Sequence, residues 1–257
     1  MYLSGARHSS GASVMQYLRK LTTMGSAGAR TRRNGVRGVI FDMDGTLTVP
    51  VLDFVKMRKE VGVALGRDIG RADMLKEVEA EICEDRRQAA LEAIRIVERE
   101  GHEKMKLARD VRAVCDFLDE RNIPRAILTR NSKESLDYFH DRLPAIPKFH
   151  PAVSRDCGFL PKPHPDALEH ISTQVWGFST NEVLMVGDSA KDDVRAGRRA
   201  GAITVLLGGE AERKDLPDEE HKPHFRIKDL TEFRNLLEEN FELLADEGEA
   251  VEVGQEK

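Results

Sequence analysis

Cysteine is scarce in this sequence of 257 residues: Cys83, Cys115 and Cys157 are odd in number and far apart. Their spacing excludes a disulfide framework and a CxxC zinc site, and it fits a reducing compartment. Long hydrophobic runs are also missing. The apolar run at 183–186 is among the longest and is far too short to cross a bilayer. We therefore expect no membrane partner.

Aromatic residues make up only 5% of the chain, too few to suggest a stacking platform for nucleic acid. Hydrophobic residues make up 40% and charged residues 33%, and there are only 10 prolines, which is the composition of a globular protein and not of a disordered or fibrous one. The length suffices for one large α/β domain, or for a core domain with a smaller second one.

No acidic residue precedes Asp42. Seven basic residues give the first 41 positions a charge of +7, whereas 33 basic and 45 acidic residues give the rest a charge of −12. This acidic body argues against nucleic acid as a partner. The basic leader, 1–34, with a short amphipathic pattern at 14–21, has the composition of a mitochondrial or plastid transit peptide. The alternative is a disordered basic tail, or translation from Met15 or Met24, on a cytoplasmic protein.

From residue 36 onward, short apolar and β-branched runs alternate with helical patterns. We expect strands at 36–41, 125–128, 183–186, 203–207 and 224–227, and helices at 111–120, 165–175, 191–200 and 230–237. This alternation predicts an α/β fold with a Rossmann-like, mostly parallel sheet between helices. Such sheets bind ligands at the carboxyl ends of their strands.

The segment 53–106, between the first two strands, contains no convincing strand. Helical spacing relates two groups of apolar residues: Met74, Leu75, Val78 and Ile82, and then Ala90, Ile94 and Val97. Gly101 suits the end of the second of these helices. We expect a small α-helical cap of three helices here, inserted in a core formed by 35–52 and 107–240. The acidic end, 241–257, is expected to be a disordered tail.

Two carboxylates, Asp42 and Asp44, follow the first expected strand in the sequence DMDGT. Both can project into one site, and Gly45 permits a sharp turn. Asp42 could attack phosphorus to form an aspartyl phosphate, while Asp44 protonates the leaving oxygen and later deprotonates water. A calcium loop is the alternative, but Thr46 and Asp53 stand where its acidic fifth ligand and its twelfth, a glutamate, are needed.

Three later segments can serve the same site. Thr129, Arg130 and Asn131 follow the second strand and could hold an anion, although a helix cap is the alternative. Lys162 stands between two prolines and could neutralise carboxylate and phosphoryl oxygens, or it could be a solvated surface lysine. The segment 187–193 (GDSAKDD) follows another strand and supplies oxygen ligands suited to Mg²⁺, or it is an N-capped helix start.

Together these four segments resemble, in order, the four motifs of the haloacid dehalogenase-like (HAD) hydrolase superfamily. The resemblance covers residues from about 36 to 237. The wording KPHPDAL and the helical insertion resemble the branch that contains phosphoglycolate phosphatase and β-phosphoglucomutase. The segment FDMDGTLTVPVLDF, together with LTRN, is similar to eukaryotic hydrolase-like members, among them plant proteins.

The resemblance implies a Mg²⁺-dependent phosphatase that acts on a small-molecule phosphomonoester. Asp42 would be the nucleophile and a metal ligand, and Asp44 the general acid/base, whose backbone carbonyl also binds the metal. Thr129 would bind a phosphoryl oxygen, with Arg130 and Asn131 also facing the substrate.

The resemblance also implies roles in the last two motifs. Lys162 would hold the nucleophile and the phosphoryl group. Asp188 would bind Mg²⁺, and Asp192 would support the metal directly or through water. Asp193 stands where this branch often has an apolar residue, so its role stays open.

Asp44 separates activities within the superfamily, because dehalogenases of this kind lack an acid there and P-type ATPases carry threonine. It therefore favours a phosphatase or a phosphomutase. A sugar phosphomutase is the first alternative and a non-catalytic regulatory module the second. We expect a monomer. The cap is slim, which predicts room for bulky substrates; Arg58 and Arg71 could recognise an anion there, but we expect them to be solvated.

Overall fold

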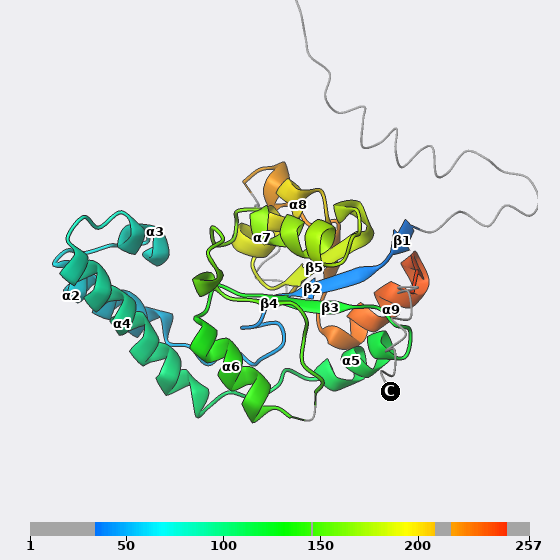
Figure 1. Cartoon of the computed structure of the whole chain (residues 1–257), viewed down its shortest axis with the longest axis horizontal. Helices are drawn as coiled ribbons and strands as arrows, with labels where there is room; N and C mark the ends of the chain where they lie inside the picture. Colours follow the sequence, from blue (N-terminus) through cyan, green and yellow to red (C-terminus); the bar gives the residue numbers. More distant parts are fainter. Residues whose placement is uncertain (1–33, 145, 209–216, 246–257) are drawn as a thin grey trace, which may run out of the picture. The chain divides into compact units, whose positions relative to one another are not determined.

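The computed structural model describes residues 34–144, 146–208 and 217–245, which form an α/β fold (Figure 1). The leader, apart from Asn34, and the last twelve residues, 246–257, lie outside the described residues. No helix in the described ranges combines the length and apolar character needed to cross a membrane.

A six-stranded parallel sheet forms the centre of the fold, in the order β4-β3-β2-β5-β6-β7. Its strands are β2 (Gly38–Phe41), β3 (Arg125–Leu128), β4 (Ala152–Val153), β5 (Val183–Gly187), β6 (Ile203–Leu207) and β7 (Phe225–Ile227). The parallel α/β fold expected from the alternation is thereby confirmed. The sequence analysis missed β4, because two residues are too few to make a pattern.

Helices cover both faces of this sheet (Figure 1). One face carries α5 (Val111–Asp119), α6 (Lys133–Arg142) and α9 (Leu230–Asn240). The other carries α7 (Asp166–Glu169) with the π-helical turn η2 (His170–Val175), and α8 (Arg195–Ala200) after the π-helical turn η4 (Ala190–Val194). Short 3-10 turns lie at η1 (Arg155–Cys157), η3 (Thr180–Glu182) and η6 (Glu219–His221).

The central strand β2 is buried on both sides. Val39 and Phe41 belong to the apolar cluster under α5 and α9, whereas Ile40 belongs to the cluster under α7. Because successive side chains of a strand point to opposite faces, a strand between two helical layers is apolar without interruption. Phe41 packs edge-on against Phe233 of α9, with the ring centres 5.7 Å apart. This packing fixes the strand that ends at Asp42.

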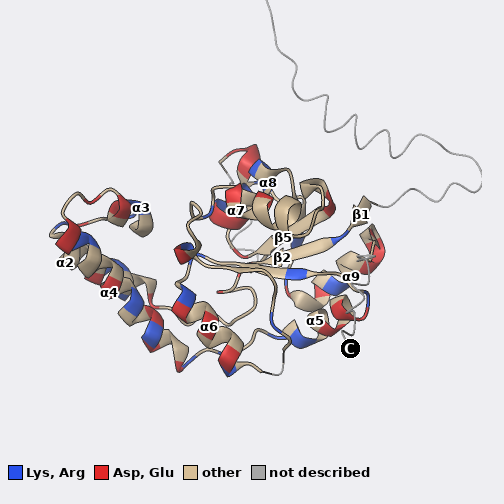
Figure 2. Cartoon of the chain, in the orientation of Figure 1, with Lys and Arg blue, Asp and Glu red and all other residues tan. Residues whose placement is uncertain are grey.

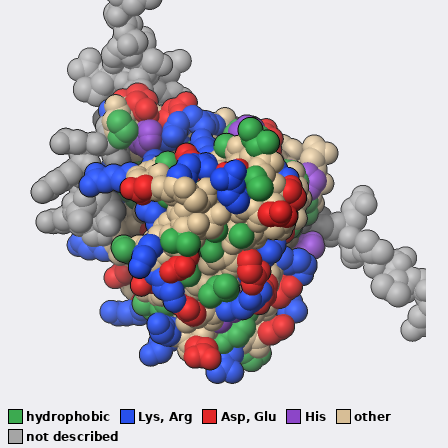
Figure 3. All heavy atoms as spheres, turned by 90° about the vertical axis from the view of Figure 1, so that its left-hand side faces the viewer, with side chains coloured by type: hydrophobic (Ala, Val, Ile, Leu, Met, Phe, Trp, Pro, Cys, Tyr) green, Lys and Arg blue, Asp and Glu red, His purple; other side chains and the backbone are tan. Residues whose placement is uncertain are grey.

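The insertion after β2 forms three helices, α2 (Phe54–Leu65), α3 (Met74–Glu79) and α4 (Glu84–His102). We call these helices and the loops that connect them the cap. Buried apolar residues join α2 to α4, among them Met57, Val61, Ile94 and Val97. Acidic and basic residues are mixed along α4 (Figure 2) and on the face of the molecule seen from the cap side (Figure 3).

Two expectations for the cap are wrong in detail. Ile82 lies beyond the end of α3 and is 96% exposed, so it does not belong to that helix's apolar face. Gly101 lies inside the last turn of α4 and does not terminate it. A Cβ on Gly101 would lie 2.7 Å from Leu52 Cδ2, so the leucine side chain packs closely on the glycine backbone.

The expected disordered tail is wrong for its first residues. The segment β8 (Phe241–Leu243) pairs with β1 (Asn34–Val36) in a two-stranded sheet. Phe241 is only 3% exposed and packs edge-on against Phe225, with ring centres 5.4 Å apart. Burial of this aromatic ring outweighs the acidic character of the sequence that follows it.

Candidate active site

The carboxyl ends of three neighbouring strands form the site. Asp42 follows β2, Thr129 follows β3 and Asp188 follows β5, and β2 pairs with both of the other strands. Residues distant in sequence therefore meet at one edge of the sheet. Together with Lys162 and Asp44 they line a cavity of about 390 Å³ that the core shares with the cap.

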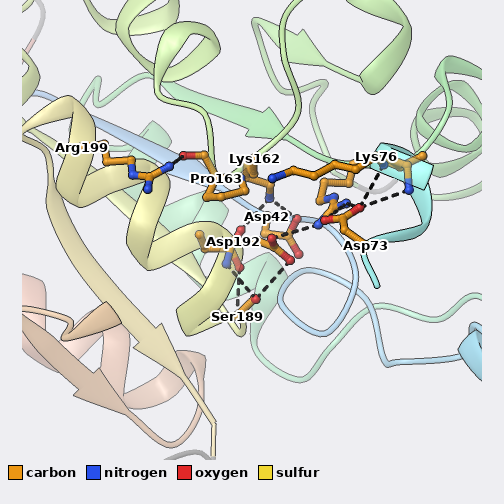
Figure 4. A network of polar contacts seen from close by, with 11 residues as sticks. Asp42, Asp73, Lys76, Lys162, Pro163, Ser189, Asp192 and Arg199 are labelled. Carbon is orange, nitrogen blue, oxygen red and sulfur yellow. Dashed lines mark hydrogen bonds and ion pairs between the residues drawn. The ribbon is translucent and has the colours of Figure 1, made fainter. Parts of the chain in front are cut away.

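Lys162 binds two carboxylates at the bottom of this cavity. Its Nζ donates to Asp42 Oδ1 at 2.5 Å and to Asp193 Oδ1 at 2.6 Å, and it points toward Asp42 in Figure 4. Lys162 is only 3% exposed. Burial disfavours its charged form, but the carboxylates of Asp193 and Asp42 outweigh burial and raise the pKa of Lys162. The ammonium group therefore stays charged.

Two buried carboxyl groups, Asp42 and Asp193, bind this single ammonium group, and the partly buried Asp188 lies near it. Burial raises the pKa of Asp42 to about 6, although Lys162 opposes the shift. Burial and the nearby Asp193 raise the pKa of Asp188 to about 7. Burial also raises the pKa of Asp193 to about 7, against the effect of Lys162. The protein alone therefore supplies too little positive charge for these acids.

The same three carboxylates fit a divalent cation. One oxygen from each of Asp42, Asp188 and Asp193 lies within 4.8 Å of the others. The backbone leaves room for them: a Cβ on Gly45, whose φ is +79°, would overlap the Asp188 carboxylate, and a Cβ on Gly187 would overlap that of Asp193. Hard carboxylate oxygens are the ligands that Mg²⁺ prefers. Among the described residues, this is the donor set that suits Mg²⁺.

Asp192 was expected to support the metal directly or through water, and this stays a prediction. Its Oδ1 accepts from Arg130 Nη1 at 2.9 Å, and it is Asp193 that joins the carboxylate group. Ser189 decides between the two neighbours: its hydroxyl accepts from the Asp192 N–H at 3.1 Å, while its own N–H donates to Asp193 Oδ2 at 3.0 Å. These local bonds turn Asp193 toward Lys162.

Asp44 is held by neutral donors. Asn131 Nδ2 donates to Asp44 Oδ2, and Thr48 Oγ1 donates to Asp44 Oδ1 at 3.2 Å. Burial raises the pKa of Asp44 despite these bonds, which favours its protonated form. Asn131, expected to face the substrate, thus contacts Asp44, while its N–H donates to Thr129 Oγ1 at 3.2 Å.

Arg130 joins the core to the cap. Beside its bond to Asp192, its Nη2 lies 2.6 Å from Oδ1 and 2.8 Å from Oδ2 of Asp73, the residue that caps the N-terminus of α3. Figure 4 shows Asp73 reaching the site from the cap side. The sequence analysis missed Asp73, because no local pattern pairs residues so far apart in the chain.

A second link, also missed from the sequence, anchors α4. Glu98 is 2% exposed and its Oε2 lies 3.1 Å from Arg155 Nη2 and 2.7 Å from Ser132 Oγ. Arg155 also donates to the backbone carbonyl of Arg130 at 3.2 Å. The only signal in the sequence was a glutamate on the apolar side of a helix, one residue after Val97. Glu98 and Arg155 both line the cavity, so their ion pair fixes the cap helix α4 beside it.

Comparison with known proteins agrees with this geometry. The family model described as haloacid dehalogenase-like hydrolase matches residues 36–201. A haloacid dehalogenase-like hydrolase domain-containing protein of Arabidopsis thaliana is 41% identical over 227 residues, covering 84% of this chain and 88% of the relative. A phosphoglycolate phosphatase of Photobacterium profundum is 28% identical, covering 67% of this chain and 83% of the relative.

Among solved structures, a hydrolase from Pseudomonas syringae shares the fold. Its TM-score is 0.62 at 22% identity, and the alignment covers 80% of this chain and all of the other. The motif residues at the strand ends, the matching family model and the Arabidopsis relative together carry one conclusion: the chain belongs to the haloacid dehalogenase-like hydrolase family.

Proposed function

We propose that this hydrolase is a phosphatase that cleaves a small-molecule phosphomonoester through a covalent aspartyl phosphate on Asp42. The observation that carries the proposal is the contact of Asp42 with the buried Lys162, beside an Asp44 that burial keeps ready to donate a proton. The phosphoglycolate phosphatase of Photobacterium profundum, as a relative, supports the reaction class.

In the first step, a carboxylate oxygen of Asp42 attacks phosphorus while the bond between phosphorus and the leaving oxygen breaks. Asp44 gives its proton to that oxygen, so that the leaving group departs as a neutral alcohol while the phosphoryl group stays on Asp42. Lys162 offsets the negative charge on the phosphoryl oxygens. Thr129, which is 5% exposed and lines the cavity, offers its hydroxyl to one of these oxygens.

In the second step, water attacks phosphorus and Asp44, now ionised, takes the proton. The bond between phosphorus and Asp42 breaks, which releases inorganic phosphate and restores the carboxylate. The bonds from Asn131 and Thr48 hold Asp44 in place for both proton transfers.

Asp42, Asp188 and Asp193 would hold Mg²⁺, with the Asp44 carbonyl as a further predicted ligand. When bound, Mg²⁺ would neutralise charge on the phosphoryl oxygens. Lys162 has a separate part, since it keeps Asp42 oriented and ionised.

The test is release of phosphate from a panel of phosphomonoesters, with Mg²⁺ or with EDTA, by the wild type and by Asp42→Asn. We expect turnover only with Mg²⁺, and a loss of about 10⁴-fold or more in the variant, because the nucleophile is gone. Asp53→Asn is the matched control, since Asp53 is an exposed N-cap that asparagine can replace.

A folded protein that binds Mg²⁺ but releases no phosphate from any substrate would contradict the proposal. Transfer of the phosphoryl group between sugar phosphates would instead identify a sugar phosphomutase. If the protein catalyses neither reaction, the non-catalytic regulatory module is the alternative that remains.

A further inference from the structure

The charged side chains of the cavity divide into paired and unpaired groups. The paired ones are Lys162 with Asp42 and Asp193, Arg130 with Asp73 and Asp192, and Arg155 with Glu98. Within the described part of the chain, the cavity cations that no carboxylate contacts are Arg58, Arg71 and Lys191. These three side chains therefore bring positive charge to the cavity lining without a carboxylate partner.

Two of these cations belong to the cap. Arg58 lies on α2, and its Nη1 donates to the carbonyl of Ala72 at 2.6 Å, which holds the guanidinium beside the loop before α3. Arg71 lies on that loop and is exposed. Both line the same cavity as Asp42 and Thr129, which come from the core, so the cap arginines can reach a group bound in that cavity.

The rest of the cap wall is apolar. Met57, Met74 and Ile94 are representative of its lining, and no neutral side chain of the cap that faces the cavity can form a hydrogen bond. A sugar placed there would lose hydrogen bonds to water without replacing most of them, which costs binding energy. An apolar scaffold would lose nothing comparable and would gain from burial.

We propose, on the basis of the phosphatase function proposed above, that the leaving group of the substrate is an apolar scaffold with a second anionic group. Arg58 and Arg71 bind that group, which is a carboxylate or a second phosphate. Either anion pairs with a guanidinium through two parallel hydrogen bonds. The two arginines thus determine specificity and take no part in bond cleavage.

The experiment compares kcat/KM for matched substrates. Phenyl phosphate is the neutral reference, para-carboxyphenyl phosphate and para-phenylene bisphosphate carry the two anions, and versions with one or two methylene groups vary the reach. We expect the best anionic substrate to exceed phenyl phosphate by about tenfold or more, the usual worth of a charged hydrogen bond. Whichever series is preferred identifies the anion.

Variants of Arg71 test which residue creates the preference. Arg71→Gln should lower the ratio of kcat/KM for the best anionic substrate to kcat/KM for phenyl phosphate by about tenfold. Arg71→Glu should invert it and favour para-(aminomethyl)phenyl phosphate. Arg67→Gln is the matched control, because Arg67 also belongs to the cap but binds Glu77 and Glu81 away from this cavity; its ratio should stay that of the wild type.

Arg58 needs a conservative partner variant because its guanidinium also holds Ala72. Arg58→Gln should lower the ratio, and Arg58→Lys, which keeps the charge, should restore most of it. An active enzyme with equal kcat/KM for the charged and neutral substrates would overturn this inference and leave the phosphatase standing. No activity on any substrate would instead contradict the proposed function itself.

Discussion

Lys162 is the residue on which the charge balance of the site depends. It contacts Asp42 and Asp193 and lies close to Asp188, and the pKa values of these acids are raised to about 6 or 7. Acids whose pKa is raised by folding stabilise the fold below their unfolded value of 3.8, and this contribution is lost as the pH rises through 6 to 7. Near pH 8 the ionised acids of the site therefore destabilise the metal-free protein.

Lys162→Met tests this balance. Near pH 8 the variant leaves ionised, buried carboxylates without a counter-ion, so its free energy of unfolding should fall by about 3 kcal/mol. Near pH 5 the acids are protonated and the loss should be much smaller. Urea unfolding of the metal-free proteins at both pH values measures the difference, with the exposed Lys191→Met as control. An equal loss at both pH values would contradict this account.

Most site residues could be predicted because they directly follow strands. Residues on a helical turn could not, because the sequence does not show which of them faces the site. Asp42, Thr129 and Asp188 each follow a buried apolar strand, which sequence alone reveals. Asp192 and Asp193 are neighbours on the π-helical turn η4, and neighbouring side chains on a helical turn point in different directions. Which of them faces Lys162 depends on hydrogen bonds of Ser189 that no pattern of residue types displays.

At the level of helices and strands, ion pairs join the cap to the core. Asp73 contributes in two ways, as the N-cap of α3 and as an ion-pair partner of Arg130. Its Oδ1 caps α3 by accepting from Leu75 N at 3.1 Å, and its carboxylate binds Arg130. Asp73→Asn keeps a good cap but loses the charge, whereas Asp73→Ala loses both. We expect amide exchange to become faster in α3 for both variants, and α3 to be further destabilised in Asp73→Ala by about 1 kcal/mol.

Exchange in the second half of α4, which Glu98 anchors independently, should stay unchanged. Equal exchange in the wild type and both variants would mean that Arg130 does not hold the cap.

The contact between α4 and α6 predicts a dependence on pH. His102 Nε2 lies 3.0 Å from Ser135 Oγ, and its ring stacks on Tyr138. Burial lowers the pKa of His102 below its usual 6.5. The stabilisation of the folded protein by the neutral His102 ring is therefore present above pH 6.5. It is lost as the pH falls through the lower pKa that His102 has in the folded state.

Urea unfolding of the wild type, compared with His102→Gln at pH values near 7.5 and 5, measures this effect. The wild type should lose more stability on acidification than the variant, in which no imidazole is protonated. The exposed His170→Gln is the control and should behave as the wild type. A variant with the full acid sensitivity of the wild type would locate the titration elsewhere.

Buried apolar strands were predictable and contacts between elements were not. The expected boundaries of β3 and β6 agree with the structure, because these strands are short runs of buried residues between turns. Glu98 lies on α4 and Arg155 on the 3-10 turn η1, and their pairing appears only when α4 packs on the core. Ile82 shows the converse, since helical spacing alone did not bury it.

At the scale of the whole molecule, the metal should stabilise the fold. A ligand that binds only the native state at 100 times its Kd adds about 2.7 kcal/mol to stability. Mg²⁺ should therefore raise the Tm of the protein, and EDTA should reverse the change. Asp188→Asn should abolish the rise, whereas the exposed control Asp53→Asn should show it in full. An unchanged Tm in saturating Mg²⁺ would contradict the assignment of the carboxylate group.

A covalent aspartyl phosphate on Asp42 distinguishes this mechanism from direct attack of water on the substrate, and rapid acid quenching can detect it. The enzyme is mixed with its substrate and Mg²⁺, quenched within one turnover, digested and examined by mass spectrometry. We predict one added phosphoryl group on Asp42, which is absent from Asp42→Asn. Full turnover with an unmodified Asp42 at every quench time would contradict the account.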